Sequence, residues 1–435
     1  MNTVLLPLTP WVATIPLQWQ VRRLGTVADI ILSNVDKHTL EGELPVRLCN
    51  YTDVYKNDRI TAAIEFMLAS ALPREIEKFQ LREGDVLATK DSEAPNDIAV
   101  AAVVAEELPG VLCGYHLAII RPDQRQLYGF FLSWVHSSKQ IRAQYEAQAV
   151  GVTRFAIGQA AFKEVYIPLP PISEQRRIVA YLDEQTEKID RLMDMRRRQM
   201  ALLKEQRSAL IQQAVTRGLN PNVPMKDSGL PWLGEIPEHW TLTRAKFISD
   251  IFVPQRNKPE LNEIEGFYWV TMDEMTQSEI YSATYKVSQL ALSATGSRLL
   301  PQGSVIASCV GNFGVASVNK VPVVINQQLQ AFIPYRISAE FLRLIVSLSA
   351  PYFEMIATAA TLEYVNQAGF ANLSIPLPPK GEQAEIIEFV ASQNAQFETL
   401  HAAYNRQLTL LTEYRAALIH ECVIGQRLTP EAVSP

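Results

Sequence analysis

Apolar residues recur at alternating steps of four and three through two long stretches of this chain. The first stretch begins at Ser173 and ends at Gly218, and the second begins at Gly381 and ends at Gly425. Neither contains a proline or an internal glycine. Since this period places apolar residues on one stripe, it predicts two helices of about 44 residues, or about 66 Å each, that pair as a coiled coil. The alternative is that each helix packs only on the domain beside it.

Polar residues dilute the predicted seam between the two helices. The proposed seam positions are Ile178, Leu182, Gln185, Ile189, Leu192, Gln199, Leu203 and Leu210 in the first stretch, and Ile386, Val390, Gln393, Phe397, Leu400, Gln407, Leu411 and Leu418 in the second. Such a repeat, sustained over several heptads, favours a coiled coil over an independent globular helix.

The two stretches are copies of one another. Shifting IPLPPISEQ, which starts at Ile167, onto IPLPPKGEQ, which starts at Ile375, gives roughly 20 identities over about 49 residues without a gap, as expected of a duplication. Consecutive prolines forbid a helix, so each copy opens extended. The helix is then predicted to begin at a cap residue, Ser173 or Gly381, followed by Glu-Gln.

Short apolar runs separated by turn residues fill the chain before each helix. Segments such as GDVLATK and GSVIASC predict strands, whereas residues 127–149 and residues 338–361 have helical spacing. The predicted fold class is α/β or α+β. The predicted boundaries are domain 1–166, helical segment 167–220, domain 221–374, helical segment 375–428 and tail 429–435.

A Trp-Pro segment opens each half. Pro10-Trp11 and Trp19 match Pro231-Trp232 and Trp240 at a constant shift. We interpret these residues as a packed hinge that holds a linker against its domain; the alternative is stacking on nucleic-acid bases.

Composition limits where nucleic acid could bind. The net charge is −6 and the pI is near 5.7, which excludes a protein that binds nucleic acid over its whole surface. The chain has no apolar run of 18 residues and no signal-peptide pattern, so we predict a soluble, cytoplasmic protein without a membrane partner. The cysteines Cys49, Cys113, Cys309 and Cys422 are scattered, which indicates core thiols and no metal site.

Catalytic signatures are missing from the sequence. It contains neither a P-loop nor an Asn-Pro-Pro-Tyr or Gly-rich methyltransferase motif. The acidic and basic residues Asp85, Lys90, Asp91 and Glu93 lie in one short stretch without a separated acidic partner, so we interpret them as a strand and its turn. The chain is therefore predicted not to be an enzyme by itself.

Two variable domains, each followed by IPLPP-x-x-EQ and a long helix, with PWLGEIPEHW opening the second half, resemble the specificity subunit of Type I restriction-modification enzymes. The resemblance covers about residues 10–428. It implies binding of bipartite double-stranded DNA, one half-site per domain, and an antiparallel coiled coil that fixes their separation. It also implies partners: modification subunits that use S-adenosylmethionine to methylate adenine, and restriction subunits that use ATP and magnesium to cleave DNA. No cofactor is expected on this chain.

An antiparallel pair that overlaps over its full length would place Leu192 opposite Leu400. Gln185 would lie beside Gln407, and Gln199 beside Gln393, which would give two polar layers that fix the alignment. A helix pair about 66 Å long spans about 19 base pairs at 3.4 Å each, an upper limit on the separation of the half-sites.

Base recognition requires directed donors and acceptors on loops. The candidates are Asn50, Tyr51, Lys90, Ser92, Tyr115 and His116 in the first domain, and Thr271, Asn312, Asn326, Gln327 and Gln328 in the second. For Arg196, Arg197 and Arg198, a solvated or partner-facing helix surface is favoured over a phosphate clamp.

Two other functions remain open from the sequence. One is a scaffold that holds two protein-binding modules without DNA. The other is the specificity subunit of a fused enzyme that cuts on both sides of its site.

Overall fold

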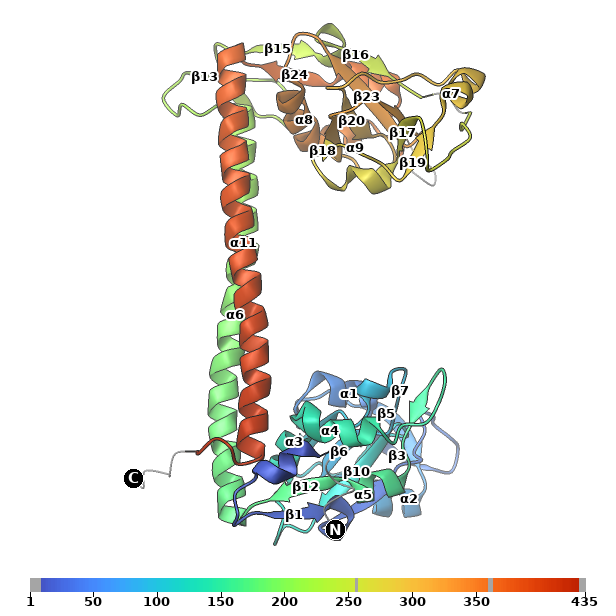
Figure 1. Ribbon diagram of the computed structural model, residues 1–435, viewed down its shortest axis with the longest axis vertical. Helices are drawn as coiled ribbons and strands as arrows, with labels where there is room; N and C mark the ends of the chain where they lie inside the picture. Colours follow the sequence, from blue (N-terminus) through green and yellow to red (C-terminus); the bar gives the residue numbers. More distant parts are fainter. Residues whose placement is uncertain (1–8, 255–256, 359–362, 430–435) are drawn as a thin grey trace. The chain divides into compact units, whose positions relative to one another are not determined.

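The computed structural model describes residues 9–254, 257–358 and 363–429. The chain forms two compact units (Figure 1). Unit 1 comprises Met1–Arg197 and Tyr404–Pro435, and unit 2 comprises Arg198–Ala403. The long helices α6 (Ile172–Arg217) and α11 (Lys380–Val423) each contribute a segment to both units.

Unit 1 is built on a five-stranded sheet in the order β2-β10-β6-β8-β4 and a three-stranded sheet in the order β5-β3-β9. Its strands are β1 (Gln20–Arg23), β2 (Ala28–Leu32), β3 (Leu44–Cys49), β4 (Arg59–Ile60), β5 (Met67–Ala71), β6 (Val86–Thr89), β7 (Asp91–Ser92), β8 (Ala101–Val104), β9 (Val111–Cys113), β10 (Leu117–Pro122), β11 (Phe155–Ala156) and β12 (Tyr166–Leu169). Its shorter helices are α1 (Tyr51–Lys56), α2 (Pro73–Phe79), α3 (Gly129–Ser137), α4 (Lys139–Glu146) and α5 (Gln159–Glu164), with 3₁₀ turns η1 (Pro10–Thr14), η2 (Leu24–Thr26) and η3 (Pro95–Asp97).

Unit 2 repeats this plan, with sheets in the orders β16-β23-β20-β21-β18 and β19-β17-β22. Its strands are β13 (Met225–Asp227), β14 (Glu235–Pro237), β15 (Thr241–Arg244), β16 (Ser249–Phe252), β17 (Phe267–Val270), β18 (Glu279–Ile280), β19 (Tyr285–Val287), β20 (Val305–Ser308), β21 (Ala316–Asn319), β22 (Val323–Ile325), β23 (Leu329–Pro334) and β24 (Ser374–Leu377). Its shorter helices are α7 (Gln289–Thr295), α8 (Ala339–Leu348), α9 (Ala350–Ile356) and α10 (Gln367–Asn372), with 3₁₀ turns η4 (Ala245–Phe247) and η5 (Met272–Thr276).

The five-stranded sheet of unit 1 is buried on both faces. Val86 and Ala88 of β6 point into a core shared with helices α3–α6, whereas Leu87 points into a second core against the three-stranded sheet. Side chains alternate between the faces of a strand, so a strand buried on both sides reads as a continuous apolar run. This explains why the strands were recognisable in sequence, and the predicted mixed fold class with two sheet-containing domains and long helices is confirmed.

The predicted helix over residues 127–149 is two helices. Ser138 separates α3 from α4 with extended backbone angles, φ −78° and ψ 116°. The helix predicted from Ser338 is likewise divided into α8 and α9 at Ser349, just before Pro351, and its predicted end near Thr361 lies outside the described residues. A proline in the first turn is compatible with a new helix start but not with the interior of a longer helix.

Each long helix begins one residue earlier than the predicted caps. The carbonyl of Pro171 accepts the backbone N–H of Gln175 at 3.0 Å, and that of Pro379 accepts the N–H of Gln383 at 3.0 Å. Ser173 and Gly381 therefore lie inside the first turn, and their prediction as caps is wrong. A proline that precedes a helix still offers its carbonyl, so it can occupy the capping position.

The predicted seam is wrong at every second position in the middle of the helices. Leu192 and Leu400 are 42% and 43% exposed, and Gln199 and Gln407 are also exposed. The partly buried residues lie one position further on: Met193, Met200, His401 and Leu408. The predicted spacing of the seam residues has the right period. From Ile189 onward, however, the first step along α6 is four residues, to Met193, and not three residues, to Leu192. Of the other proposed positions, Ile178, Leu182, Ile189, Ile386, Val390 and Leu418 are buried, and Gln185, Leu203, Leu210, Gln393, Phe397 and Leu411 are partly buried.

The two helices run antiparallel in each unit, but with a different alignment from the predicted one. In unit 1, Arg415 Nε donates to Asp190 Oδ1 at 3.0 Å. In unit 2, Arg207 Nε donates to Asn394 Oδ1 at 2.8 Å, and its guanidinium lies 4.7 Å from the ring centre of Phe397. The predicted alignment would have placed Arg207 beside Glu385, more than a heptad away from Asn394, so the predicted alignment and its glutamine layers are wrong.

A contact near the start of α6 agrees with this stagger. Arg177 Nε reaches Thr429 Oγ1 at 3.1 Å, beyond the last residue of α11. The second turn of α6 thus contacts the tail after α11. Among the described residues, no helix is both long and apolar enough to cross a membrane.

Candidate nucleic-acid interface

Three strand ends of unit 1 bring most of the predicted residues together. β3 and β9 are parallel neighbours with Cys49 opposite Cys113, so the residues that follow them leave the same sheet edge. Tyr51 follows β3, and Tyr115 and His116 follow β9. The backbone N–H of Lys90, at the end of β6, donates to the carbonyl of His116 at 3.1 Å. We call Tyr51, Lys90, Asp91, Tyr115, His116 and Arg154 recognition surface 1.

Aromatic rings line recognition surface 1. The imidazole of His116 makes edge-on contacts with the rings of Tyr51 and Tyr115, at centroid distances of 5.6 Å and 5.1 Å. Both tyrosines are exposed, at 37% and 47%. The ammonium group of Lys90 lies 4.2 Å from the ring centre of Tyr115. Exposed rings beside cations can contact the apolar and polar edges of bases and the phosphate backbone.

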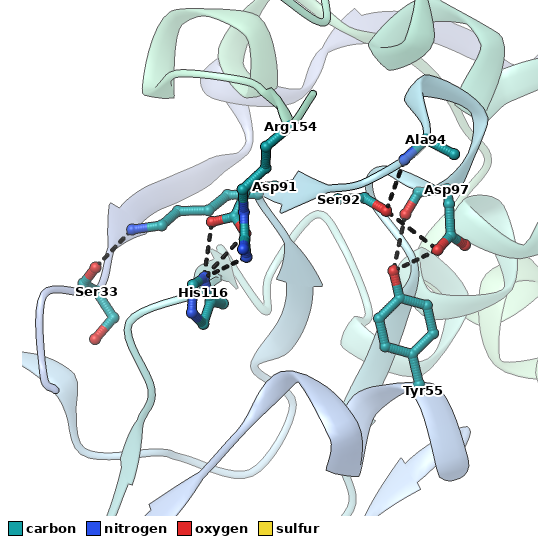
Figure 2. A network of polar contacts seen from close by, with 9 residues as sticks. Ser33, Tyr55, Asp91, Ser92, Ala94, Asp97, His116 and Arg154 are labelled. Carbon is teal, nitrogen blue, oxygen red and sulfur yellow. Dashed lines mark hydrogen bonds and ion pairs between the residues drawn. The ribbon is translucent and has the colours of Figure 1, made fainter. Parts of the chain in front are cut away.

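Asp91 is the centre of a polar network on this surface (Figure 2). Its Oδ1 accepts from Arg154 Nε at 3.0 Å, and Arg154 Nη2 donates to the same oxygen. His116 Nδ1 lies 2.9 Å from Oδ1 and 3.0 Å from Oδ2, so the nitrogen that faces the carboxylate carries the proton and donates it. The hydrogen bonds to Asp91 raise the pKa of Arg154, which keeps its charge.

The ammonium group of Lys90 is held in place by a backbone carbonyl. Its Nζ donates to the carbonyl of Ser33 at 2.8 Å. Burial lowers the pKa of Lys90, while the nearby Asp91 carboxylate opposes that shift. The lysine is therefore a half-buried cation with a fixed position, and not a freely moving surface side chain.

Ser92 belongs to a second group beside the first. Ser92 Oγ donates to Asp97 Oδ2 at 3.2 Å, and the hydroxyl of Tyr55 donates to the same oxygen at 2.7 Å (Figure 2). Burial, followed by the hydrogen bond to Asp97, raises the pKa of Tyr55. These bonds fix the loop 92–97 against α1.

Asn50 and Thr271 each cap a helical turn. Asn50 is only 7% exposed and caps α1, with its backbone N–H bonded to Asp53 Oδ2 at 2.7 Å. Thr271 caps η5 and donates from Oγ1 to Glu274 Oε2 at 2.8 Å. Both side chains are committed inside their units, because a short polar side chain at this position satisfies free helical N–H groups.

In unit 2 the corresponding turn carries amides. Asn326, Gln327 and Gln328 lie between β22 and β23, just as residues 114–116 lie between β9 and β10. Asn326 Nδ2 donates to Gln328 Oε1 at 3.1 Å, and Asn326 Oδ1 accepts the backbone N–H of Gln328 at 3.1 Å. Gln328 is exposed, and so is Asn312 in the loop between β20 and β21. We call Asn312, Asn326, Gln327 and Gln328 recognition surface 2.

A family model described as the Type I restriction modification DNA specificity domain matches residues 16–199 and 240–410. The chain belongs to this family. The predicted membership is confirmed, and each match includes one sheet-containing domain with part of a long helix.

Curated relatives of this specificity family match most of the length of the chain. The putative type I restriction enzyme MjaX specificity subunit of Methanocaldococcus jannaschii is 21% identical over 383 residues, which cover 86% of each chain. The MjaVIII specificity subunit of the same organism is 21% identical over 393 residues, or 87% of this chain and 86% of the relative.

Solved structures show the same fold. The HsdS subunit from Thermoanaerobacter tengcongensis matches with a TM-score of 0.58 and 20% identity, over 95% of this chain and 98% of that one. A chain from a structure concerned with complex assembly and conformational transition of the type I R-M system matches with a TM-score of 0.72 and 20% identity, over 95% and 99%.

Two residues of recognition surface 1 were not among the sequence candidates of this family member. The sequence pattern places Asp91 in a strand and its turn and gives no indication of Arg154. The only local signal for Arg154 is the turn after Gly151, whose φ of 150° and close approach to the Arg154 carbonyl require glycine. The 63 positions that separate Asp91 from Arg154 hide their contact from any local pattern.

The remaining chemistry-bearing residues of this specificity subunit are inside the protein. All four cysteines are buried and free, and burial raises the pKa of Cys309 to about 11. Asp85 is buried and accepts two hydrogen bonds from Arg121, at 2.8 Å and 2.7 Å. Across residues 9–254, 257–358 and 363–429, no group of three or more His, Cys, Asp or Glu side chains is arranged to hold a metal ion.

Two of the three consecutive arginines in the middle of α6 contact other side chains of the long helices. Arg196 lies over the ring of Tyr404 at 5.5 Å, and Arg197 donates to Asp194 at 2.9 Å. Both contacts are within unit 1. Both guanidinium groups therefore bind along the helix pair. These contacts fit the interpretation of the three arginines as part of a helix surface and not as a phosphate clamp.

Proposed function

We propose that this chain selects the DNA target of a type I restriction-modification complex, with unit 1 reading one half of a bipartite site and unit 2 the other. The observation that carries the proposal is that two units of the same topology present different side chains at corresponding strand ends. His116 corresponds to Gln328, and Asp91 to Val310. A common framework with different loops is suited to reading two different sequences.

The capping residues support this division between framework and contact positions. Asn50 with Asp53 and Thr271 with Glu274 form the same cap after corresponding strands. The side chains beyond the caps differ. We assign base or backbone contacts to Tyr51, Lys90, Tyr115 and His116 in unit 1, and to recognition surface 2 in unit 2.

We assign the chemistry to partner subunits. In this proposal the chain is not catalytic, and modification subunits bind S-adenosylmethionine and methylate adenine, while restriction subunits use ATP and magnesium to cleave. Exposed apolar residues on the long helices support docking of partners. They are Leu192, Met195, Leu410 and Tyr414 in unit 1, and Leu202 and Leu400 in unit 2. Apolar side chains outside a helix seam are typical of protein contact surfaces.

The decisive experiment is to map modified adenines in the host genome by single-molecule sequencing, with and without this gene. We expect a gapped, asymmetric methylated motif that disappears on deletion and returns on complementation. A methylation pattern that deletion leaves unchanged would refute the function. Filter binding of pooled DNA, with the chain alone and with its modification subunits, distinguishes DNA recognition from a scaffold that binds proteins only.

A further inference from the structure

We propose that Arg154 reads a guanine in the half-site of unit 1, and that Asp91 is the positioning residue that aims its guanidinium. This inference rests on the proposed function, because it names a base and the residue that reads it. Neither residue belongs to the assignments made above.

The hydrogen-bond pattern of Arg154 leaves one edge of the guanidinium open. Asp91 occupies the side edge, since it accepts from Nε and from Nη2. The end edge, formed by Nη1 and the outer hydrogen of Nη2, has no acceptor among the described residues other than the nearby Nδ1 of His116, at 3.1 Å from Nη2. That nitrogen already carries the proton that it donates to Asp91, so it cannot accept.

The open edge has the geometry that guanine requires. Guanine presents two acceptors, O6 and N7, to the major groove, and the paired N–H groups of arginine match them in a bidentate contact. The Arg154 side chain is 54% exposed, whereas that of Asp91 is 10% exposed. The acid is thus largely covered by the unit, whereas about half of the arginine side chain is open to solvent.

The backbone beneath this pair is held by strand pairing. β11 pairs with β7, with Ala156 opposite Asp91. Arg154 directly precedes β11, and its side chain reaches Asp91 from there. The chain turns back at Gly151, and Val150 and Ala156 exchange hydrogen bonds at 3.1 Å and 2.9 Å. The hairpin therefore presents Arg154 from a fixed base.

A purely structural ion pair explains these contacts less well. The Arg154 end of the pair is exposed, and the hairpin is already fixed by its backbone hydrogen bonds. Unit 2 has Val310 where unit 1 has Asp91, although the framework is shared, so the device belongs to the reading of one half-site. Arg125 offers a matched comparison, since it makes the same side-edge pair with Asp123, at 2.9 Å and 3.1 Å, at the opposite end of β10 from His116.

The test uses the full chain assembled with its modification subunits. The wild-type target is first selected from a random DNA library, and each position is then substituted in turn. We expect Arg154→Ala to weaken discrimination at one guanine of one half-site by about 5- to 140-fold, the range of a bidentate base contact, and to leave the other half-site unchanged. Arg154→Lys should fail in the same way because it keeps the charge but loses the planar fork. Arg125→Ala should leave every position unchanged.

Modified bases separate base reading from phosphate binding. Replacing that guanine with 7-deazaguanine removes N7, so it should weaken wild-type binding and have no further effect on Arg154→Ala. Inosine keeps O6 and N7 and should bind normally. Asp91→Ala should lose the guanine preference without losing affinity for random DNA, and Asp91→Glu should restore part of it.

The outcomes distinguish this inference from the proposed function. If the wild-type complex selects no motif, the proposed function fails. If it selects a motif but Arg154→Ala and Arg154→Lys change no base preference, or Arg154→Ala weakens all sequences equally, guanine reading by Arg154 is overturned while the function stands. A guanine preference retained by Asp91→Ala overturns the positioning role alone.

Discussion

The indole Nε1 of Trp19 donates a hydrogen bond of 3.0 Å to Glu174 Oε2, in the first turn of α6. Trp240 makes the same bond, also 3.0 Å, to Glu382 in the first turn of α11. Both rings are buried, which supports the interpretation of these tryptophans as a packed hinge and excludes base stacking for them. The neighbouring glutamines add a second contact between each long helix and its domain. Gln175 accepts the backbone N–H of Tyr128 at 2.7 Å, and Gln383 accepts that of Ser338 at 3.0 Å.

The Trp19–Glu174 bond predicts that its removal lowers the stability of unit 1 without changing the DNA sequence that is recognised. Trp19→Phe keeps the ring burial but removes the donor to a carboxylate, so it should lower the free energy of unfolding of unit 1 by about 1.5–3 kcal/mol. Urea unfolding followed by far-UV circular dichroism measures this. Glu174→Gln in the Trp19→Phe background should add little, and a fully additive double variant would contradict the pairing. The methylated motif should stay the same.

The buried His136 predicts acid sensitivity. Its Nδ1 faces the carbonyl of Leu132 at 2.9 Å and its Nε2 the hydroxyl of Tyr145 at 2.8 Å, so it is a neutral ring between an acceptor and a donor. Burial lowers the pKa of His136 to about 4. The unfolded chain takes up a proton near pH 6.5 and the folded chain does not, so stability is lost as the pH falls from about 6.5 to about 4.

The expected loss between pH 7 and pH 5 from this group is about 2 kcal/mol. Unfolding free energies measured in urea at both pH values test it. His136→Gln should be less stable at pH 7 but should show a smaller difference between the two pH values. An equal difference in the variant would mean that His136 stays accessible to protons.

Neighbouring residues of α6 test the observed seam. Ile189 is buried within unit 1, so Ile189→Ala should cost about 2–4 kcal/mol through lost contacts and a cavity. Leu192→Ala, three residues away at an exposed position, should cost less than about 0.5 kcal/mol. Thermal unfolding of the two variants measures the contrast. Equal losses would favour the seam predicted from sequence. Leu192→Ala should instead reduce copurification of the modification subunits.

The Asp85–Arg121 pair is predicted to be structural. Arg121→Met would leave the nearly inaccessible Asp85 carboxylate without its cation, so unit 1 should lose about 3–5 kcal/mol of stability. Chemical unfolding measures the loss, and target selection at a permissive temperature should be normal. Arg125→Met, which breaks the exposed pair with Asp123, is the matched control and should have little effect on unfolding. A loss of modification activity with unchanged stability in Arg121→Met would point to a functional role instead.

The sequence alone determined the duplication, the long helices and the fold class, because these depend on local and periodic features. Consecutive prolines, the lack of helix breakers up to Gly218 and Gly425, and fully apolar strands such as β6 are all readable without a partner. It also indicated Tyr51, Tyr115 and His116 as candidates, because base recognition requires directed donors and acceptors on loops.

Only the tertiary structure decided which helical positions face one another and which polar residues act together. A heptad repeat sets the period of a seam, but the order of its steps and the stagger depend on contacts between residues far apart in the chain, such as Asp190 with Arg415. Asp91 and Arg154 meet because β11 pairs with β7. Hydrogen bonds of a few ångströms between residues far apart in the chain leave no periodic trace, so their partners emerge only when the strands are paired.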